Sequence, residues 1–439
     1  MSSSVQVKEV VLITPSEPTP TQVLHLSALD SQLFLRFTIE YLLVFKSRNG
    51  LDKNATTARV KSALARALVP YYPLAGRVRA RTGGVSGLEV LCRAQGAFFV
   101  EAVSDHSLSE FEGAPRYVTQ WRKLLSSYVS DVPKGAPLLV VQLTWLADGG
   151  ATLGVGFSHC MCDGIGSAEF LNSFAELATG KRGHTEFKPK PIWDRHLLDP
   201  SPFLPTQPNS VSHPEFNRVP DLSGFVSRFS QGRLIPTSFT FDKRRLNDLK
   251  KLANSKSRLN ESSSFTSFEV LSAHIWRSWA RALNLPSNQV LKLLFSINIR
   301  NRMNPSVPSG YYGNAFVLGC ARTSMKDLTE KGLGYAAELM KRAKERVNEQ
   351  YVREVVEMVS SSQASPDSVG VLVLSQWSRL GLDRVDFGLG RPVQVGPICC
   401  DRYCLMLPVY DQKDAVKVMV AVPTSVVDKY DSLIRSTNS

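Results

Sequence analysis

The stretch His159-Cys160-Met161-Cys162-Asp163-Gly164 lies between a run that predicts a strand and a run that predicts an amphipathic helix. Residues 151–158 before it are apolar, as in a buried strand. Residues 165–180 after it carry apolar side chains at helical spacing and end at a glycine, a common helix stop. His159 is therefore expected at a strand end, at the edge of a cleft. Because histidine exchanges a proton near neutral pH, it is a candidate general base.

Two other interpretations of this loop stay open at this point. A histidine near a strand end can be a purely structural residue, and Cys160 and Cys162 could suggest a metal site. However, His-Cys-x-Cys lacks the spaced second ligand pair that tetrahedral zinc needs, and neighbours along a strand point to opposite sides. We therefore predict no metal here, and the rest of the chain must decide between a catalytic and a structural histidine.

Length and composition predict a globular protein of two domains. The chain has 439 residues, more than one hydrophobic core usually supports, with 43% hydrophobic and 21% charged residues. No apolar run approaches the roughly 18 residues of a membrane span, and the N-terminus does not match a secretory signal. Seven cysteines, an odd number, are then best explained as reduced thiols, so we expect a cytoplasmic protein.

The net charge of +13 favours anionic partners. No nucleic-acid-binding pattern accompanies it and the basic residues are spread along the chain, so we expect no nucleic acid and rather a phosphate-bearing small molecule. The densest basic cluster lies between residues 243 and 258 and includes Lys256. It predicts either a solvated helix face or a contribution to holding a small polyanion.

A proline-rich stretch divides the chain. Nine prolines fall between residues 180 and 236, so this segment cannot be one long helix or a central strand. We interpret it as a crossover and predict an N-terminal domain at 1–180, the crossover at 181–236 and a C-terminal domain at 237–439. A long surface loop within one domain is the alternative.

Strands and helices are expected in both halves, which predicts an α/β protein with a cleft between two domains. The sequence predicts helices over 56–69 and 330–347, the second of them largely exposed, and strands over 137–146, 291–299, 369–374 and 416–422. Thr266-Ser-Phe-Glu269 matches a capping box, which predicts the start of another helix.

A second glycine-containing motif is Asp386-Phe387-Gly388-Leu389-Gly390. Its Asp-Phe-Gly is found in protein kinases, but the other kinase motifs are missing. Two close glycines after an aspartate predict a tight turn whose carboxylate is used locally. From the residues alone, Asp386 is therefore interpreted as structural.

Together these segments resemble the BAHD acyltransferase family of plants, which transfers acyl groups from coenzyme A thioesters to alcohols or amines. The family signatures His-x-x-x-Asp-Gly and Asp-Phe-Gly-Trp-Gly match His159 to Gly164 and Asp386 to Gly390, with Leu389 in place of the usual tryptophan. The supporting matches, which extend the resemblance over nearly the whole chain, are LSALD (26–30), YYPLAGR (71–77), PIWDR (191–195), SFTSFEVLSAHIWRSWARAL (264–283), NIRNRMNPSVPSGYYGNAF (298–316) and SQWSRLGLDRVDFG (375–388).

The resemblance implies an α/β fold of two chloramphenicol-acetyltransferase-like domains with a central solvent channel. It implies an acyl-CoA-dependent O-acyltransferase that has no permanently bound cofactor and works as a monomer on acyl-CoA and a small-molecule alcohol. An N-acyltransferase acting on an amine, and a family-fold protein with lyase-type or purely binding function, are the alternatives.

The resemblance also assigns roles to residues. His159 is expected to be the general base and Ser375 the hydroxyl that stabilises the oxyanion, and Asp386 is kept as a catalytic candidate because its family counterpart is sometimes given a direct role. Structural support of the site is expected from Asp163, Gly164, Arg300 and Trp377, with Asp163 paired to Arg300. Coenzyme A is expected near Thr266, Ser267 and Lys256, because a helix N-terminus offers free N–H groups to phosphates.

Overall fold

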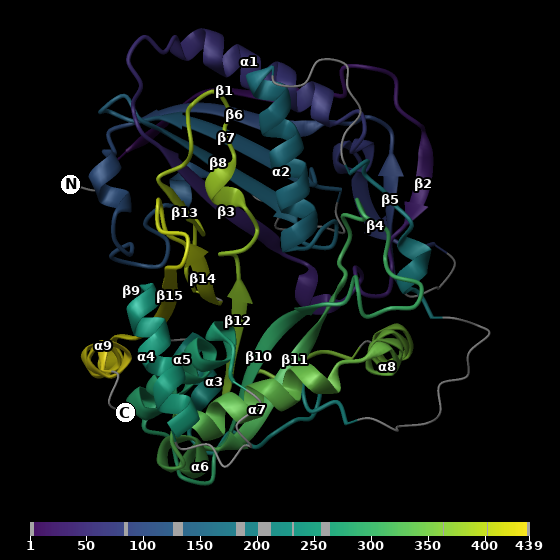
Figure 1. Cartoon of the computed structure of the whole chain (residues 1–439). Coiled ribbons are helices and arrows are strands. Elements are labelled where there is room, and N and C mark those ends of the chain that lie inside the picture. The colour runs from purple at the N-terminus through teal and green to yellow at the C-terminus, as the bar shows by residue number, and fades with distance from the viewer. Residues whose placement is uncertain are drawn as a thin grey trace.

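The computed structural model of the chain describes residues 4–82, 87–125, 135–180, 189–200, 212–230, 232–255, 264–362, 364–401 and 403–436. Two six-stranded sheets and one three-stranded sheet form its framework. The first six-stranded sheet occupies the upper half of Figure 1 and the second the lower half, with helices packed on each. The mixture of strands and helices in both halves is the predicted α/β architecture.

The first sheet has the strand order β1-β6-β7-β8-β3-β13. All neighbours are antiparallel except β6 and β7, which run parallel. The strands predicted over 137–146 and 151–158 are present as the antiparallel pair β7 and β8, and both are buried along their whole length. The strands are β1 (Val5–Ile13), β6 (Ala97–Ser104), β7 (Leu139–Trp145), β8 (Ala151–Ser158), β3 (Thr38–Phe45) and β13 (Gln394–Gly396).

Two helices pack against each other over the first sheet, α1 (Lys53–Ala67) and α2 (Gly164–Thr179) (Figure 1). Asp163 is the N-cap of α2, and its carboxylate accepts a hydrogen bond from the Gly166 N–H. Gly180 ends α2 in the left-handed conformation, at φ 66°. Both helices were predicted, because their apolar stripes and end signals are local in sequence.

The second sheet has the order β11-β10-β12-β14-β15-β9 and contains the predicted strands of the C-terminal half. It is mixed, since β12 runs parallel to both β10 and β14. Its strands are β11 (Phe316–Ser324), β10 (Val290–Asn298), β12 (Val371–Gln376), β14 (Cys404–Pro408), β15 (Val416–Pro423) and β9 (Leu234–Phe241).

Helix α5 (Ser267–Leu283) lies at the centre of the helices that cover one face of the second sheet, and it begins at the predicted capping box of Thr266 and Glu269. The remaining helices of this half are α3 (Phe225–Ser230), α4 (Lys243–Ser255), α6 (Met325–Glu330), α7 (Leu333–Arg346), α8 (Glu349–Ser361) and α9 (Val427–Arg435).

The single helix predicted over 330–347 is wrong. Gly332 lies at φ 86°, a left-handed conformation that interrupts a helix, so α6 ends at Glu330 and α7 begins at Leu333. The prediction of a largely exposed helix is also wrong. Side chains such as Ala336 and Met340 are buried against α5 and the sheet, and the charges occupy the opposite face.

Smaller elements complete the fold. The third sheet has the order β2-β5-β4, from strands β2 (Gln22–His25), β5 (Leu88–Cys92) and β4 (Arg77–Ala80). The 3₁₀ helices are η1 (Leu33–Leu35), η2 (Tyr72–Ala75), η3 (Leu108–Phe111), η4 (Arg122–Leu124), η6 (Arg195–Leu198), η7 (Leu382–Arg384) and η8 (Thr424–Val426). Across the described residues, no helix has both the length and the apolar character needed to cross a membrane.

One strand crosses between the two halves. Strand β13 belongs to the C-terminal part of the chain but pairs with β3 of the first sheet, with Val395 opposite Leu43. The division into domains at 1–180, 181–236 and 237–439 stays a prediction. Strand β13 is the part of the C-terminal segment that pairs with the sheet of the N-terminal half. Of the predicted crossover, residues 181–188, 201–211 and 231 lie outside the described residues.

Candidate active site

A cavity of about 1180 Å³ lies between the two large sheets. The face of the second sheet that the helices leave uncovered forms one wall. Along β10 the side chains alternate, so that Leu293, Phe295 and Ile297 join the core under the helices. Their neighbours face the cavity and are Leu294, Ser296 and Asn298. The opposite wall comes from the first half of the chain and includes residues 34–40 and His159.

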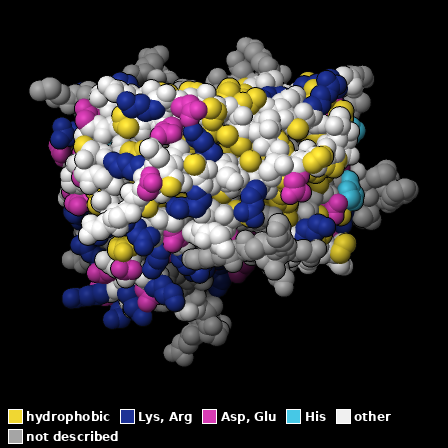
Figure 2. Space-filling model, turned by 90° about the horizontal axis from the view of Figure 1, so that it is seen from above, with side chains coloured by type: hydrophobic (Ala, Val, Ile, Leu, Met, Phe, Trp, Pro, Cys, Tyr) yellow, Lys and Arg dark blue, Asp and Glu magenta, His cyan; other side chains and the backbone are white. Residues whose placement is uncertain are grey.

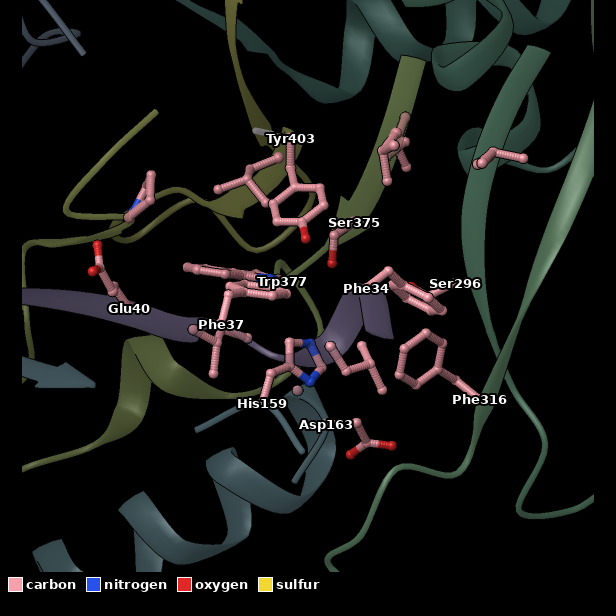
Figure 3. A pocket seen from close by; sticks show the side chains of 18 of the residues that line it. Phe34, Phe37, Glu40, His159, Asp163, Ser296, Phe316, Ser375, Trp377 and Tyr403 are labelled. Atoms are coloured by element: carbon pink, nitrogen blue, oxygen red, sulfur yellow. The ribbon is translucent and has the colours of Figure 1, made fainter. Parts of the chain in front are cut away.

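The cavity wall is mainly apolar around its centre and polar at one end. Figure 3 shows Phe34, Phe37 and Phe316 beside His159, whereas Glu40 lies at the far side of the cavity. The Glu40 carboxylate forms an ion pair with Arg122, which also lines the cavity. The charges there are therefore balanced within the protein.

His159 follows the last residue of β8 and is fixed through its own backbone. Its N–H donates to the Phe37 carbonyl at 2.9 Å. Its ring lies between two aromatic rings, with centroid distances of 5.1 Å to Phe37 and 6.1 Å to Phe316. Figure 3 shows the imidazole at the cavity wall with its ring directed into the space.

The side chain of Asn314 determines which ring nitrogen of His159 carries the proton. The Asn314 Nδ2 group donates to the His159 carbonyl and to the Asp30 carboxylate, each at 2.8 Å. These two acceptors orient the amide so that its oxygen faces His159 Nδ1 at 3.1 Å. Nδ1 must therefore be the protonated nitrogen, which leaves the lone pair of a neutral ring on Nε2.

Burial keeps this ring neutral. The pKa of His159 is lowered below 6.5, mainly because the charged form loses its solvation. Asp163, Asn314 and Asp30 act in the opposite direction without reversing the shift. The imidazole is thus unprotonated at neutral pH, which is the state that a general base needs.

A buried ion pair supports the Asn314 amide from behind. Arg195 and Asp30 are 1% and 0% exposed, and Arg195 Nη1 lies 2.9 Å from Asp30 Oδ1. The same oxygen accepts the Asn314 backbone N–H at 2.9 Å. Arg195 Nη2 donates to the Met161 carbonyl at 2.7 Å, so the pair also fixes the backbone within the His-x-x-x-Asp loop. Arg195, Asp30 and Asn314 form a connected set that ends at His159.

Figure 3 shows the carboxylate of Asp163 directed away from the ring of His159. This carboxylate binds Arg300. Arg300 Nη1 and Nη2 donate to the two carboxylate oxygens at 2.8 and 3.0 Å, in a bidentate pair. The Ala315 N–H donates to Asp163 Oδ2 at 3.1 Å. The expected contact with Arg300 is therefore present, and it joins the first half of the chain to the second.

A glycine allows the start of α2 to lie directly against the backbone of the second half of the chain. A Cβ atom on Gly166, in the first turn of α2, would lie 2.0 Å from the Tyr312 carbonyl oxygen. No other residue type fits at this distance. Gly164, the first residue of the helix, has more room, because its Cβ would meet only a Leu380 methyl group at 3.2 Å.

Ser375 and Trp377 lie at the end of β12 and line the cavity across from His159. Figure 3 shows the Ser375 hydroxyl pointing into the cavity near Tyr403. The Trp377 ring is 5% exposed and packs on Tyr41 at a centroid distance of 4.7 Å. The oxyanion role of Ser375 stays a prediction.

Asp386 is not among the residues that line the cavity. Its Oδ1 accepts the backbone N–H groups of Gly388 and Gly390 at 2.8 and 2.9 Å, and both glycines have left-handed φ angles. This geometry favours the structural interpretation over the direct catalytic role that the resemblance left open. Leu389, in place of the family tryptophan, is buried in the core of the first half.

Two of the residues expected to hold coenzyme A, Thr266 and Ser267, do not line the cavity. Thr266 is exposed at the start of α5, and its hydroxyl accepts the Glu269 N–H in the capping box. Lys256 lies outside the described residues. The assignment of coenzyme A to this position stays a prediction.

The cysteines of the loop are poor nucleophiles. Burial raises the pKa of Cys160 to about 12 and holds that of Cys162 well above its usual value. All seven cysteines are free. In the described part of the chain, no cluster of three or more His, Cys, Asp or Glu side chains could hold a metal ion.

Three supporting residues were missed by sequence reasoning, namely Asn314, Asp30 and Arg195. Each lies in a segment that carries the family resemblance, but a segment match alone gives no role. The available signal was a polar or charged residue inside an otherwise apolar or glycine-rich segment. Their partners are up to 284 residues away in sequence, so the contacts themselves could not be inferred.

The basic character of the chain is visible on its surface. Figure 2 shows lysine and arginine side chains interspersed with acidic ones on this face, with the densest group at its lower left corner. Such a distribution differs from the continuous basic stripe that tracks a nucleic-acid backbone.

Comparison with known proteins gives consistent results. A family model described as Transferase family matches residues 3–433. The taxadien-5-alpha-ol O-acetyltransferase of Taxus chinensis is 34% identical over 440 residues, covering 97% of this chain and 95% of that protein. The fatty alcohol:caffeoyl-CoA acyltransferase of Arabidopsis thaliana is 32% identical over 435 residues, covering 97% of each.

Solved structures of the same fold are also found. Vinorine synthase superposes with a TM-score of 0.72 at 22% identity, over 97% of this chain and 96% of that one. F. sporotrichioides TRI101, solved with coenzyme A and T-2, gives a TM-score of 0.74 at 17% identity, over 94% and 97% of the two chains. The expected α/β fold of the chloramphenicol acetyltransferase type is thereby confirmed.

Proposed function

This chain belongs to the BAHD family of acyltransferases, and we propose that His159 is its general base in the transfer of an acyl group from acyl-CoA to the hydroxyl of a small-molecule acceptor. The enzyme is an O-acyltransferase with acyl-CoA as its co-substrate. The observation that carries the proposed role is the hydrogen bond from His159 Nδ1 to the Asn314 amide oxygen. It leaves Nε2 as the proton acceptor inside a cavity large enough for two substrates.

The first chemical step requires a base. An alcohol is too weakly acidic to attack a thioester unaided, so its proton must leave as the new C–O bond forms. A neutral imidazole within hydrogen-bond distance typically contributes about 10²- to 10⁴-fold in rate. His159 Nε2 takes the proton, and the positive charge that develops on the ring is stabilised by the Asn314 oxygen at Nδ1.

The second step requires a donor for the oxyanion and a proton for the leaving group. We assign the donor to the Ser375 hydroxyl, which faces the cavity from the wall opposite His159. When the tetrahedral intermediate collapses, the C–S bond breaks and the thiolate of coenzyme A takes the proton back from Nε2. The ester and free thiol are the products, with no covalent acyl-enzyme. The high pKa of the Cys160 thiol supports the direct route.

The cavity favours an acceptor with an apolar body. Its centre is lined by Phe34, Phe37 and Phe316, and Glu40 and Arg122 at one end neutralise each other. A polyamine would find little compensation for burying a charge among the three aromatic rings. We therefore propose an uncharged alcohol as the acceptor, with an amine as the second candidate.

The decisive experiment measures release of coenzyme A thiol from a panel of thioesters with alcohols and amines. His159→Ala should lower the rate per folded molecule at least about 100-fold. His196→Ala, at an exposed histidine, is the matched control and should behave as wild type. Equal rates in wild type and His159→Ala would overturn the proposed role.

Two further assignments belong to this proposal. Seven free thiols are what a reducing compartment allows, so we assign the enzyme to the cytoplasm. We also propose that it works as a monomer, because the cavity is built from the two halves of one chain.

A further inference from the structure

A second pocket, of about 600 Å³, lies at an edge where the two halves of the chain meet. Strands β9 and β15 of the second sheet supply one side, and β13 with residues 112–114 supplies the other. None of its lining residues lines the catalytic cavity. A volume in this range suits one small organic molecule.

Lys417 of β15 is the cation of this pocket. Its ammonium donates to the Glu112 backbone carbonyl at 3.2 Å and to the Gln394 side-chain oxygen at 3.1 Å. Both acceptors are neutral, and within the described residues no carboxylate lies within ion-pair distance of Lys417. A half-buried charge without a counter-ion is unfavourable, and burial accordingly lowers the pKa of this lysine.

Gln394 adds a second unused donor next to Lys417. Its side-chain oxygen accepts a hydrogen bond from Lys417, which fixes the orientation of the amide. The Nε2 group remains as a hydrogen-bond donor. This Nε2 is buried and has no hydrogen-bond partner among the described residues. A buried amide donor without a partner lowers stability until some acceptor reaches it.

The other charged residues at the pocket do not supply this acceptor. Asp431 lines the pocket, but its two oxygens accept from Arg435 at 2.8 and 3.2 Å. Glu112 is exposed and contacts Lys417 through its backbone oxygen. The rest of the lining is mixed. Its larger apolar residues are Pro236, Phe239, Val393, Val395, Pro408, Val409 and Val427, and its hydroxyl-bearing residues are Thr237, Ser238, Thr240 and Tyr410.

We propose that this pocket binds a small amphiphilic carboxylate, whose anionic group bridges Lys417 Nζ and Gln394 Nε2 and whose apolar body lies against Val393 and Val409, which are partly exposed at the pocket wall. One carboxylate oxygen can accept from the third ammonium hydrogen, and the other from the amide after a small rotation of the Gln394 side chain. The ligand would bridge β15 and β13 and so tie the two halves of the chain together. The catalytic cavity contributes no residue to it.

The test measures binding of benzoate to the full-length protein by calorimetry. The titration is done at constant ionic strength and in the absence of any thioester. Benzamide, which has the same ring without the charge, is the matched ligand control. We expect Lys417→Met to weaken benzoate binding at least about tenfold, since a charge-assisted contact contributes about 1.5–3 kcal/mol. Lys413→Met, at an exposed lysine, should leave it unchanged. Equal binding of benzoate by wild type and Lys417→Met, or of benzoate and benzamide by wild type, would overturn the proposal.

Two further measurements keep the proposal testable if Lys417→Met folds poorly or if benzoate also enters the catalytic cavity. In wild type, benzoate should protect Lys417 but not Lys413 from reductive methylation, as read by mass spectrometry of the peptides. Equal labelling of Lys417 with and without benzoate contradicts the site. His159→Ala should retain this protection, so the result does not depend on the proposed catalytic role.

Discussion

The two signature loops of this enzyme differ in what their aspartates do. In the first loop, Asp163 is bound to Arg300 and Ala315 of the second half, while His159 faces the cavity. In the second, Asp386 binds two glycine N–H groups of its own turn, and Phe387 packs on Phe174 of α2 at 4.8 Å. One loop joins the halves directly around the chemistry, whereas the other shapes a turn outside the cavity.

This difference shows that a signature motif can support the fold without lining the cavity. Both loops hold the C-terminal part of the chain against the N-terminal part, the first through an ion pair and the second through a buried aromatic ring. Only the first also presents a group that can accept a proton. The two aspartates should therefore respond differently to substitution.

The largest effect is expected at Asp163. Asp163→Asn leaves Arg300 without its counter-ion at a site where the side chains are 7% and 12% exposed. Removing one partner of a buried pair typically destabilises a protein by about 3–5 kcal/mol. We expect a large loss of folded yield and a lower midpoint of denaturant unfolding. A well-folded variant that has lost only its activity would contradict this.

The control for Asp163 is Asp383→Asn. Asp383 lies 3.6 Å from Arg391, and the two side chains are 29% and 48% exposed. A solvent-exposed pair of this kind contributes about 0–1 kcal/mol. The comparison separates the effect of burial from that of charge loss alone.

The next effect is expected at Asn314, which connects the first loop to its support. Asn314→Ala removes the acceptor at His159 Nδ1 and two donors at Asp30 and the His159 carbonyl. A lost hydrogen bond of this kind is worth about 1–3 kcal/mol, which corresponds to about 5- to 150-fold in kcat. The pH profile of the activity should change as well, because the proton of the neutral His159 ring is then no longer held on Nδ1 and can also occupy Nε2. Loss of stability with an unchanged kcat would show that Asn314 has no role in orienting the base.

A smaller effect is expected at Asp386. Asp386→Ala removes the acceptor for the Gly388 and Gly390 N–H groups, so we expect about 1–3 kcal/mol of lost stability. Because the residue lies outside the cavity, kcat per folded molecule should stay within about threefold of wild type, less than one hydrogen bond contributes. Kinetics normalised to the folded fraction provide the measurement. A hundredfold drop in that quantity would restore a direct catalytic role.

The smallest effect concerns pH. Since burial lowers the pKa of His159, the ring is neutral and active at neutral pH, and activity is lost as the pH falls through this lowered pKa. The acid limb of kcat/KM should therefore have its midpoint below 6.5. Phe316→Ala, which opens the wall beside the ring, should move this midpoint upward. A midpoint at or above 6.5 in wild type would contradict the buried, neutral base.

The elements around the first loop could be predicted because their signals are local. The β7–β8 hairpin, helix α2 and the Thr266 capping box each depend on one short, continuous stretch of sequence. The resemblance to a family then supplied the fold and the expected partner of Asp163. By contrast, the three-residue strand β13 carries too short a pattern to be recognised, and its pairing is decided by the distant strand β3.

The least predictable part of the site was the support of His159. Asn314 lies 155 residues from His159, and Asp30 lies 284 residues from Asn314. Nothing in the local pattern of either segment indicates that their side chains meet. A polar contact over such separations is a property of the assembled fold.

Strand β13 has a consequence for how this chain can fold. A fragment ending near residue 236 would lack the segment that covers β3, and β3 would present its unpaired N–H and C=O groups as a new edge. Such an edge invites pairing with other copies, so the isolated N-terminal half should aggregate. The first sheet is complete only when residues 394–396 have been synthesised and have returned to it. The two halves should therefore unfold together as one cooperative unit. A chain divided at the proline-rich stretch, or one with a single half exchanged for that of a relative, should not fold correctly.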